Sequence, residues 1–176
     1  MKIAIIGTHG VGKTTLSFSI AHHLKEKGVN LKIIQEVARE CPYPINEGMT
    51  KQAALWIFHA HSKKELDALV NHKVIVSDRS IIDSLIYAKY FEIKINDRLE
   101  KYAKSLMSEY DKLIFVRPDI PLQGDGIRSE NLDFQIGVDK LFCDILEDSY
   151  NVIQINASQI FDEEQSWKNY CLPIQF

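Results

Sequence analysis

The segment Gly7–Thr14 contains the residues whose types and spacing indicate chemistry most specifically. It matches the spacing G-x-x-x-x-G-K-[ST], with an apolar strand pattern before it and a helical pattern after it, as this motif requires. The glycines let backbone N–H groups point at phosphate oxygens, and the helix N-terminus adds its dipole. Lys13 is expected to reach the β- and γ-phosphates of a nucleoside triphosphate, and the Thr14 hydroxyl to ligate Mg²⁺. The residues expected to contact the nucleotide are Gly7, Gly10, Val11, Gly12, Lys13, Thr14 and Thr15.

Two further groups of charged residues directly follow apolar strand candidates. Asp78 and Arg79 follow one such run, and Glu36 and Arg39 follow another. In a parallel sheet these strand ends meet at the edge that holds the phosphates. Asp78 is predicted to bind Mg²⁺ or its waters, and Arg79 to bind a substrate phosphate or carboxylate. Glu36 is predicted either to accept the proton of an attacking hydroxyl or to hold a sugar hydroxyl.

A polar stretch at about residues 118–131 is the least regular part of the sequence. It contains Gly124, Gly126 and Arg128 between a strand candidate and a helix candidate. A glycine-hinged loop with an arginine can close over a triphosphate and neutralise charge as the phosphoryl group moves. The stretch is therefore predicted to be a lid, with Arg128 as its catalytic residue and Arg117 as a second candidate. An ordinary surface loop with surface arginines is the alternative.

The elements that must position these residues alternate between strand and helix patterns along the chain. This alternation predicts an α/β domain with a mainly parallel sheet, buried on both faces. The strand candidates are Lys2–Ile6, Leu31–Gln35, Val74–Ser77, Lys112–Val116 and Asn151–Ile155. Helices are predicted over Lys13–Lys27, from a Thr50 cap to about Asn71, over Ser80–Phe91, from about Asn96, over Asp133–Asp148 and after Ser158. The second of these helices is expected to bury Leu55, Phe58, Leu66 and Leu69.

Length and composition indicate one soluble domain spanning residues 1–176. The chain is 45% hydrophobic with a formal net charge of −3, which argues against duplex nucleic acid as the main partner. The apolar run Lys2–Ile6 is too short for a signal peptide or a membrane span, so a cytoplasmic protein without a membrane partner is expected. The three widely spaced cysteines indicate reduced, buried thiols, and the histidine pairs suggest no metal cluster.

Three short motifs resemble those of a known group of enzymes. Glu36-Val-Ala-Arg39, Asp78-Arg79 with Asp83 and Tyr87 downstream, and Asp125-Gly-Ile-Arg128 together resemble the nucleoside/nucleotide kinase-like P-loop ATPases. The nicotinamide riboside kinase domain is the most similar group, with thymidylate and deoxynucleoside kinases more distant. The resemblance covers Lys2 to about Ile155. It implies a three-layer α/β/α domain with a five-stranded parallel sheet in the order 2-3-1-4-5, and a site at the carboxyl ends of the strands. Glu36, Arg39, Arg79 and Asp83 are then the candidate substrate-binding residues.

The resulting functional prediction is a kinase that uses ATP and Mg²⁺. The guanine-reading N-K-x-D is lacking after the fourth strand candidate, where the sequence is Arg117-Pro118-Asp119-Ile120, so ATP is favoured over GTP. The predicted acceptor is a nucleoside or a nucleoside monophosphate. Glu36 favours a hydroxyl acceptor, with Glu36 or Asp78 as the base, whereas the arginines keep a monophosphate open. A kinase acting on a hydroxyl of a polynucleotide and a non-catalytic ATP-dependent binding module or ATPase are the alternatives.

Several secondary residues keep two interpretations. Trp56 and Phe58 are candidates for the wall of a base-binding pocket, although at helical spacing such aromatic residues usually belong to the core. His9 is interpreted as a spacer in the phosphate loop rather than as a catalyst, and Asn156–Ser158 as a segment that could flank a purine ring. The sequence does not specify the acceptor, the nucleobase that it carries or the oligomeric state. A homodimer is one possible state.

Overall fold

The described part of the chain forms a five-stranded parallel sheet. A computed structural model of the full chain describes residues 1–122, 129–147 and 151–172. The strands are β1 (Lys2–Ile6), β2 (Leu31–Ile34), β3 (Val74–Asp78), β4 (Lys112–Arg117) and β5 (Val152–Asn156), in the order β2-β3-β1-β4-β5. All neighbouring strands pair in parallel. The predicted fold class, strand order and strand positions are confirmed, and the strand ends differ from the prediction by at most one residue.

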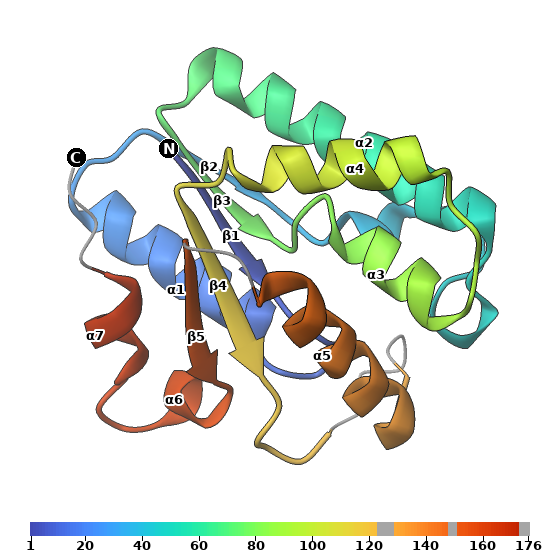
Figure 1. The fold of residues 1–176 in the computed structure, drawn as a ribbon. Coiled ribbons are helices and arrows are strands. Elements are labelled where there is room, and N and C mark those ends of the chain that lie inside the picture. The colour runs from blue at the N-terminus through green and yellow to red at the C-terminus, as the bar shows by residue number, and fades with distance from the viewer. Residues whose placement is uncertain (123–128, 148–150, 173–176) are drawn as a thin grey trace.

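Helices cover both faces of this sheet and complete a three-layer domain (Figure 1). One face is covered by α1 (Lys13–Glu26), α6 (Ser158–Phe161) and α7 (Trp167–Cys171). The other is covered by α2 (Lys51–Asn71), α3 (Asp83–Tyr90), α4 (Asp97–Met107) and α5 (Leu132–Leu146). Two short 3-10 helices, η1 (Val37–Glu40) and η2 (Asn46–Gly48), connect β2 to α2.

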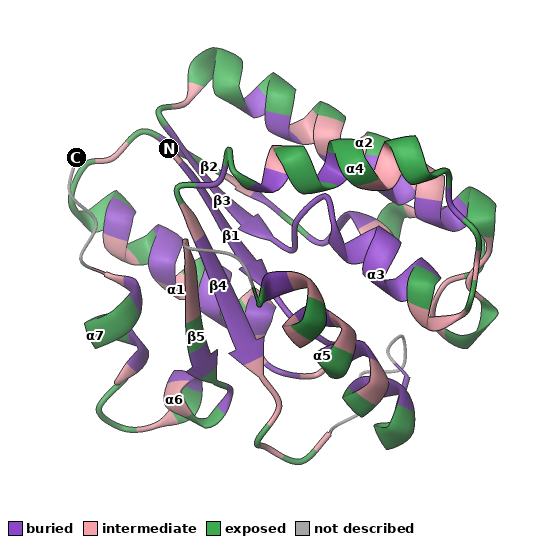
Figure 2. Cartoon of the chain, in the orientation of Figure 1, coloured by how far each residue is buried: buried purple, intermediate pink, exposed green. Residues whose placement is uncertain are grey.

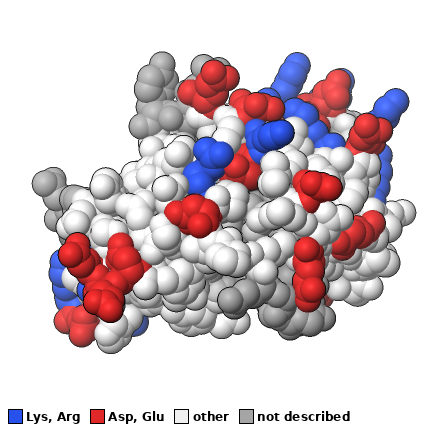
Figure 3. All heavy atoms as spheres, turned by 90° about the horizontal axis from the view of Figure 1, so that it is seen from below, with Lys and Arg blue, Asp and Glu red and all other residues white. Residues whose placement is uncertain are grey.

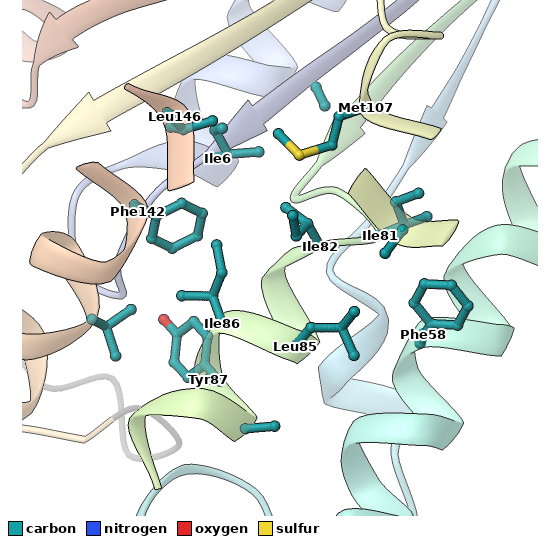
Figure 4. Close-up of a cluster of buried hydrophobic side chains, with 14 of the residues drawn as sticks. Ile6, Phe58, Ile81, Ile82, Leu85, Ile86, Tyr87, Met107, Phe142 and Leu146 are labelled. Carbon is teal, nitrogen blue, oxygen red and sulfur yellow. The ribbon is translucent and has the colours of Figure 1, made fainter. Parts of the chain in front are cut away.

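The central strands supply side chains to two hydrophobic cores, one on each face. Successive residues of a strand point to opposite faces. In β1, Ala4 and Ile6 therefore pack with the α2–α5 layer, whereas Ile3 and Ile5 pack with α1, α6 and α7. The strands are mostly purple in Figure 2, and Figure 4 shows Ile6 among side chains from the α2–α5 layer. This double burial explains why the strands read as continuous apolar runs.

Side-chain caps fix the starts of three helices. The Thr50 hydroxyl accepts a hydrogen bond from Ala53 N at 3.2 Å, as predicted. Asn96 caps α4 and Asn131 caps α5 in the same way. Each cap satisfies a backbone N–H that has no partner within the helix. The helix predicted from Ser80 begins later, at Asp83, because the residues after β3 form a tight turn that is described below.

The prediction for the buried side of α2 is wrong in the C-terminal half of the helix. Leu66 and Leu69 are exposed, by 66% and 43%, and the neighbouring Val70 by 77%. The inward face carries His61 and Glu65 instead, both almost completely buried. Apolar periodicity alone chose the wrong face, because these polar residues have hydrogen-bonding partners on the sheet side. Figure 2 shows the resulting green outer surface of α2.

The aromatic side chains follow the simpler prediction, whereas two of the three cysteines do not. Phe58 lies in the core of the α2–α5 layer (Figure 4), and Trp56 packs against a smaller cluster beside β2. Only Cys171 is buried, and burial raises the pKa of its thiol to about 12. Cys41 and Cys143 are partly exposed, so the expectation of buried thiols is wrong for these two. Within the described ranges, no helix is long and apolar enough to cross a membrane.

Candidate active site

The predicted phosphate loop connects β1 to α1 at the carboxyl end of the sheet. Gly7 has φ +133°, and a Cβ at this position would lie 2.5 Å from the backbone oxygen of Val116 on β4. Gly12 adopts a left-handed conformation, with φ 85°, at the N-cap of α1. Any larger residue at Gly7 would have to displace a backbone carbonyl, so this position requires glycine. The loop therefore has the geometry that its sequence motif predicts.

The Lys13 ammonium is buried within this loop. It donates a hydrogen bond to the backbone oxygen of Thr8. Burial and the positive charge of Arg79 lower the pKa of Lys13 to about 7, although Asp78 and Glu36 oppose this shift. The side chain thus lies in a site where its charge is only partly balanced. Triphosphate oxygens would supply the missing negative charge.

Thr14 and Asp78 provide adjacent oxygen atoms at the start of α1 and the end of β3. The Thr14 hydroxyl donates to Asp78 Oδ2 at 2.6 Å. Asp78 is buried, and β3 pairs directly with β1, which places this carboxylate beside the phosphate loop. A hydroxyl and a carboxylate are oxygen ligands of the kind that Mg²⁺ prefers. The two residues therefore fit the predicted metal site.

Glu36 lies at the centre of an ion-pair cluster on the next strand end. Its Oε1 accepts from Arg79 Nε at 2.7 Å, and its Oε2 accepts from Arg39 Nε at 2.9 Å. Burial alone would raise the pKa of Glu36, but the charges of Arg79 and Lys13 outweigh it and hold that pKa well below its usual range. Glu36 is thus an ionised carboxylate close enough to Lys13 for each to shift the other's pKa. The residues predicted to bind the nucleotide, around Lys13, therefore adjoin those predicted to bind the acceptor, around Glu36. We call these two groups the donor half and the acceptor half of the site.

Asp83 completes this cluster from the first turn of α3. Its Oδ2 accepts from both the backbone N–H and the hydroxyl of Ser80 at 2.8 Å, and its Oδ1 lies 3.4 Å from Arg79 Nη1. Burial raises the pKa of Asp83, against the opposing charges of Arg79 and Lys13. Most of the hydrogen-bonding capacity of Asp83 is directed at its own turn and at Arg79. Among the predicted substrate-binding residues, Asp83 is therefore the one that holds the turn at Ser80 and the side chain of Arg79 in place.

The backbone at Arg79 is strained. Its φ of 86° lies in the left-handed region, which non-glycine residues rarely adopt. Such a conformation costs about 1–3 kcal/mol and persists only where surrounding contacts enforce it. Here Arg79 N donates to the Ile5 oxygen at 2.9 Å, and the guanidinium lies over the ring of Tyr87 at 5.1 Å. From this strained turn, the Arg79 side chain reaches Glu36.

A pocket opens beside the Glu36–Arg79 pair. The space inside it that a water-sized sphere can reach is about 50 Å³, and its mouth is open to solvent. Residues of η1, η2, α2 and α3 line it, apolar on its walls and charged at one end. The lining residues are Glu36, Val37, Ala38, Ile45, Asn46, Met49, Ile57, His61, Arg79, Ser80, Asp83, Ser84 and Tyr87. Several of these were missed from the sequence, although Ile57 and His61 lie one turn apart on α2 and so share a face.

The remaining predicted residues divide between described and undescribed parts of the chain. Arg128, with the rest of 123–128, lies outside the described residues. Arg117 forms a two-pronged ion pair with Asp139 on α5, with contacts of 2.8–3.0 Å. The His9 oxygen accepts from Gln135 Nε2 at 2.8 Å, which fits a backbone role for this residue. Trp56 and Phe58 do not line the pocket described above.

The segment Asn156–Ser158 is held against the loop that follows β4. The backbone N–H of Ser158 donates to Asp119 Oδ1 at 2.8 Å, and its hydroxyl donates to the other oxygen of the same carboxylate.

Figure 3 views the molecule from the side on which the strands end. Where it draws described residues, acidic and basic side chains are interspersed on this face.

Comparison with known proteins agrees with the fold described above. A family model described as an AAA domain matches residues 2–163. A deoxyadenosine kinase from M. mycoides, solved with bound dATP, has a TM-score of 0.62 and 20% identity, and the match covers 90% of this chain and 91% of that one. A thymidylate kinase from Ehrlichia chaffeensis has a TM-score of 0.62 and 22% identity, with 88% and 86% covered. At these identities the likeness shows the fold. The chain therefore belongs to this AAA-domain family of P-loop proteins and has the fold of nucleoside and nucleotide kinases.

Proposed function

We propose that the protein is a kinase that transfers the γ-phosphoryl group of MgATP to a hydroxyl group of a nucleoside. The observation that carries this proposal is the position of Glu36. It is a buried, ionised carboxylate at the charged end of a pocket, and the charge of the phosphate-loop lysine helps to lower its pKa. A hydroxyl acceptor needs a group that orients it and accepts its proton, and a carboxylate does both.

The donor half would act mainly through positioning and charge. Lys13 would contact the β- and γ-phosphates, and Thr14 and Asp78 would hold Mg²⁺, which supplies charge neutralisation on the phosphates when bound. A bound triphosphate would favour the charged form of Lys13. The negative charge of its oxygens would raise the pKa of Lys13, which burial lowers. Arg128 in the predicted lid remains the candidate for closing over the transferring group.

The charges of the pocket favour a neutral hydroxyl acceptor over a monophosphate. Arg39 and Arg79, the two arginines of the Glu36 cluster, are both paired with a carboxylate. A monophosphate would have to compete with Glu36 for them, whereas a hydroxyl could approach Glu36 without breaking either pair. The buried Ser84 hydroxyl also lines the pocket and has no hydrogen-bond partner among the described residues. Burying such a group unpaired costs about 1–3 kcal/mol, so a polar ligand that bonds to it would be favoured.

The apolar pocket walls support a ring-bearing acceptor. Val37, Ala38, Ile45, Met49 and Ile57 surround the space next to the charged end. Apolar walls with a few placed polar groups are typical of small-molecule sites, and a nucleobase ring could pack against such walls. A polynucleotide acceptor is less well supported, because the net charge is −3 and charges of both signs are mixed on the described surface in Figure 3.

A transfer screen tests the proposal. The protein is incubated with Mg²⁺ and ATP labelled on the γ-phosphate, together with nucleosides, nucleoside monophosphates or an oligonucleotide with a free 5′-hydroxyl. Label should appear on at least one nucleoside, and Lys13→Ala should abolish this transfer while leaving the fold intact by circular dichroism. Tight ATP binding without transfer to any acceptor would instead identify a nucleotide-dependent binding module.

A further inference from the structure

A buried polar network connects α2 to the strained turn after β3. Glu65 is its centre: Oε1 accepts from the Tyr110 hydroxyl at 2.6 Å and lies 3.2 Å from His61 Nε2, and Oε2 lies 2.8 Å from Lys2 Nζ. His61 Nε2 is also 3.1 Å from the Ser77 hydroxyl. Every one of these side chains is buried. None of them has a role in the phosphoryl transfer proposed above.

The network contacts both ends of the segment that contains Asp78 and Arg79. Ser77 immediately precedes this segment, and its hydroxyl contacts His61. Ile81 follows it, and the Ile81 N–H donates to the Tyr110 hydroxyl at 3.3 Å. Between these two attachment points Arg79 adopts its left-handed backbone conformation. His61 also lines the acceptor pocket, so the network touches both the turn and the pocket.

Helix α2 buries this polar network in place of apolar side chains that its sequence also offers. The face of α2 that carries His61 and Glu65 turns inward, while Leu66 and Val70 remain exposed. Natural sequences depart from the apolar-inside pattern chiefly at sites with a function. The network is electrostatically consistent, because hydrogen bonds from His61, Lys2 and Tyr110 keep the pKa of Glu65 below its usual value despite its burial.

We propose that Glu65, Tyr110, His61 and Ser77 are positioning residues that hold the Asp78–Arg79 turn in its strained, active geometry. The proposal rests on the proposed kinase activity, since the turn matters only if Asp78 and Arg79 act on the phosphates and the acceptor. Glu65 orients the Tyr110 hydroxyl, which accepts the Ile81 N–H, while His61 holds Ser77. Loss of either attachment would let Arg79 relax and move its guanidinium away from Glu36.

Tyr110→Phe tests one attachment with the loss of a single oxygen atom, and Tyr102→Phe is a matched control. Tyr102 lies on α4 with 55% of its surface exposed, and none of the network contacts given above involves it. For Tyr110→Phe we expect kcat to fall about 10- to 100-fold, because small displacements of positioning groups have effects of this size. The KM for ATP should rise by a smaller factor than kcat falls, because the phosphate loop keeps its contacts and Asp78 is the one donor-site residue within the turn. Tyr102→Phe should match the wild type.

Amide hydrogen exchange gives a readout that does not depend on activity. In Tyr110→Phe the Ile81 amide loses its acceptor, so its exchange should accelerate about ten-fold or more, and it should stay unchanged in Tyr102→Phe. Ser77→Ala removes the other attachment, and its effect on kcat should combine with that of Tyr110→Phe less than additively because both act on one turn.

The outcomes separate this inference from the proposed function. If the wild type phosphorylates no acceptor, the proposed function fails, and Ile81 exchange then decides whether the network holds the turn. If Tyr110→Phe folds and shows unchanged Ile81 exchange, the inference is overturned whatever the activity. An unchanged kcat in both Tyr110→Phe and Ser77→Ala, with an active wild type, would also overturn it.

Discussion

Replacing Glu36 by glutamine removes the central charge of the acceptor half with almost no change in size. The carboxylate now accepts one hydrogen bond on each oxygen, from Arg79 at 2.7 Å and from Arg39 at 2.9 Å. A glutamine has one carbonyl oxygen and one NH₂ group. It can keep one arginine partner, while its NH₂ group would face the other guanidinium, donor against donor.

The expected effect on catalysis is large, and the effect on stability is moderate. Loss of a general base reduces kcat by about 10²–10⁴-fold, which corresponds to about 2.7–5.4 kcal/mol at 1.36 kcal/mol for each factor of ten. Removing one partner of a buried ion pair outright costs about 3–5 kcal/mol. Glu36→Gln retains one of its two hydrogen bonds, so the free energy of unfolding should fall by less than that, with Tm lowered by about 2–4 °C for each kcal/mol.

The assay compares kcat at saturating MgATP and nucleoside for the wild type, Glu36→Gln and Glu40→Gln. Glu40 is exposed and pairs with Lys64 on the surface, so its variant should retain kcat within about two-fold. Because the pKa of Glu36 lies well below its usual range, this base should be ionised throughout the neutral range, and kcat should show no acid limb from it above about pH 5. An undiminished kcat in Glu36→Gln would refute its role as a base and would point to Asp78 or to a monophosphate acceptor.

Three further predictions concern the donor half. The pKa of Lys13 is about 7 in the free protein, and phosphate oxygens should raise it. MgATP binding should therefore take up a proton between about pH 7 and 9, and it should weaken as pH rises. Calorimetry in buffers of different ionisation enthalpy measures this proton uptake, and zero uptake would contradict the prediction. Gly7→Ala should abolish ATP binding or folding, because its Cβ would lie 2.5 Å from the Val116 oxygen; a stable variant with wild-type affinity would disprove the close approach. Asp78→Asn should raise the Mg²⁺ concentration needed for half-maximal activity about ten-fold or more, as the loss of one charged ligand implies, and an unchanged Mg²⁺ titration would exclude Asp78 as a metal-binding residue.

The parts of the structure that local sequence determines were predicted well. The phosphate loop depends on glycine conformations and on one strand and one helix beside it, so eight residues suffice to predict it. The five strands were found because burial on both faces demands continuous apolar runs. Strand order came from family resemblance, since short apolar runs do not specify their neighbours.

The parts that depend on contacts between distant residues were predicted less well. Glu65 is buried because Lys2 and Tyr110 meet it from other elements, and neither is near it in sequence. Apolar periodicity therefore selected Leu66 as buried, which is wrong. The two contacts of Asp83 with Ser80 arise from a turn whose strain at Arg79 has no local sequence signal, and substrate binding by Asp83 stays a prediction.

The identity of the labelled product tests the central claim most directly. The protein is given MgATP labelled on the γ-phosphate and an equimolar mixture of nucleosides and their monophosphates, and the products are separated by chromatography. Phosphorylation of a hydroxyl, as the Glu36 pocket supports, predicts labelled nucleoside monophosphates. Labelled diphosphates without labelled monophosphates would contradict it, because the protein would then be transferring phosphate to phosphate.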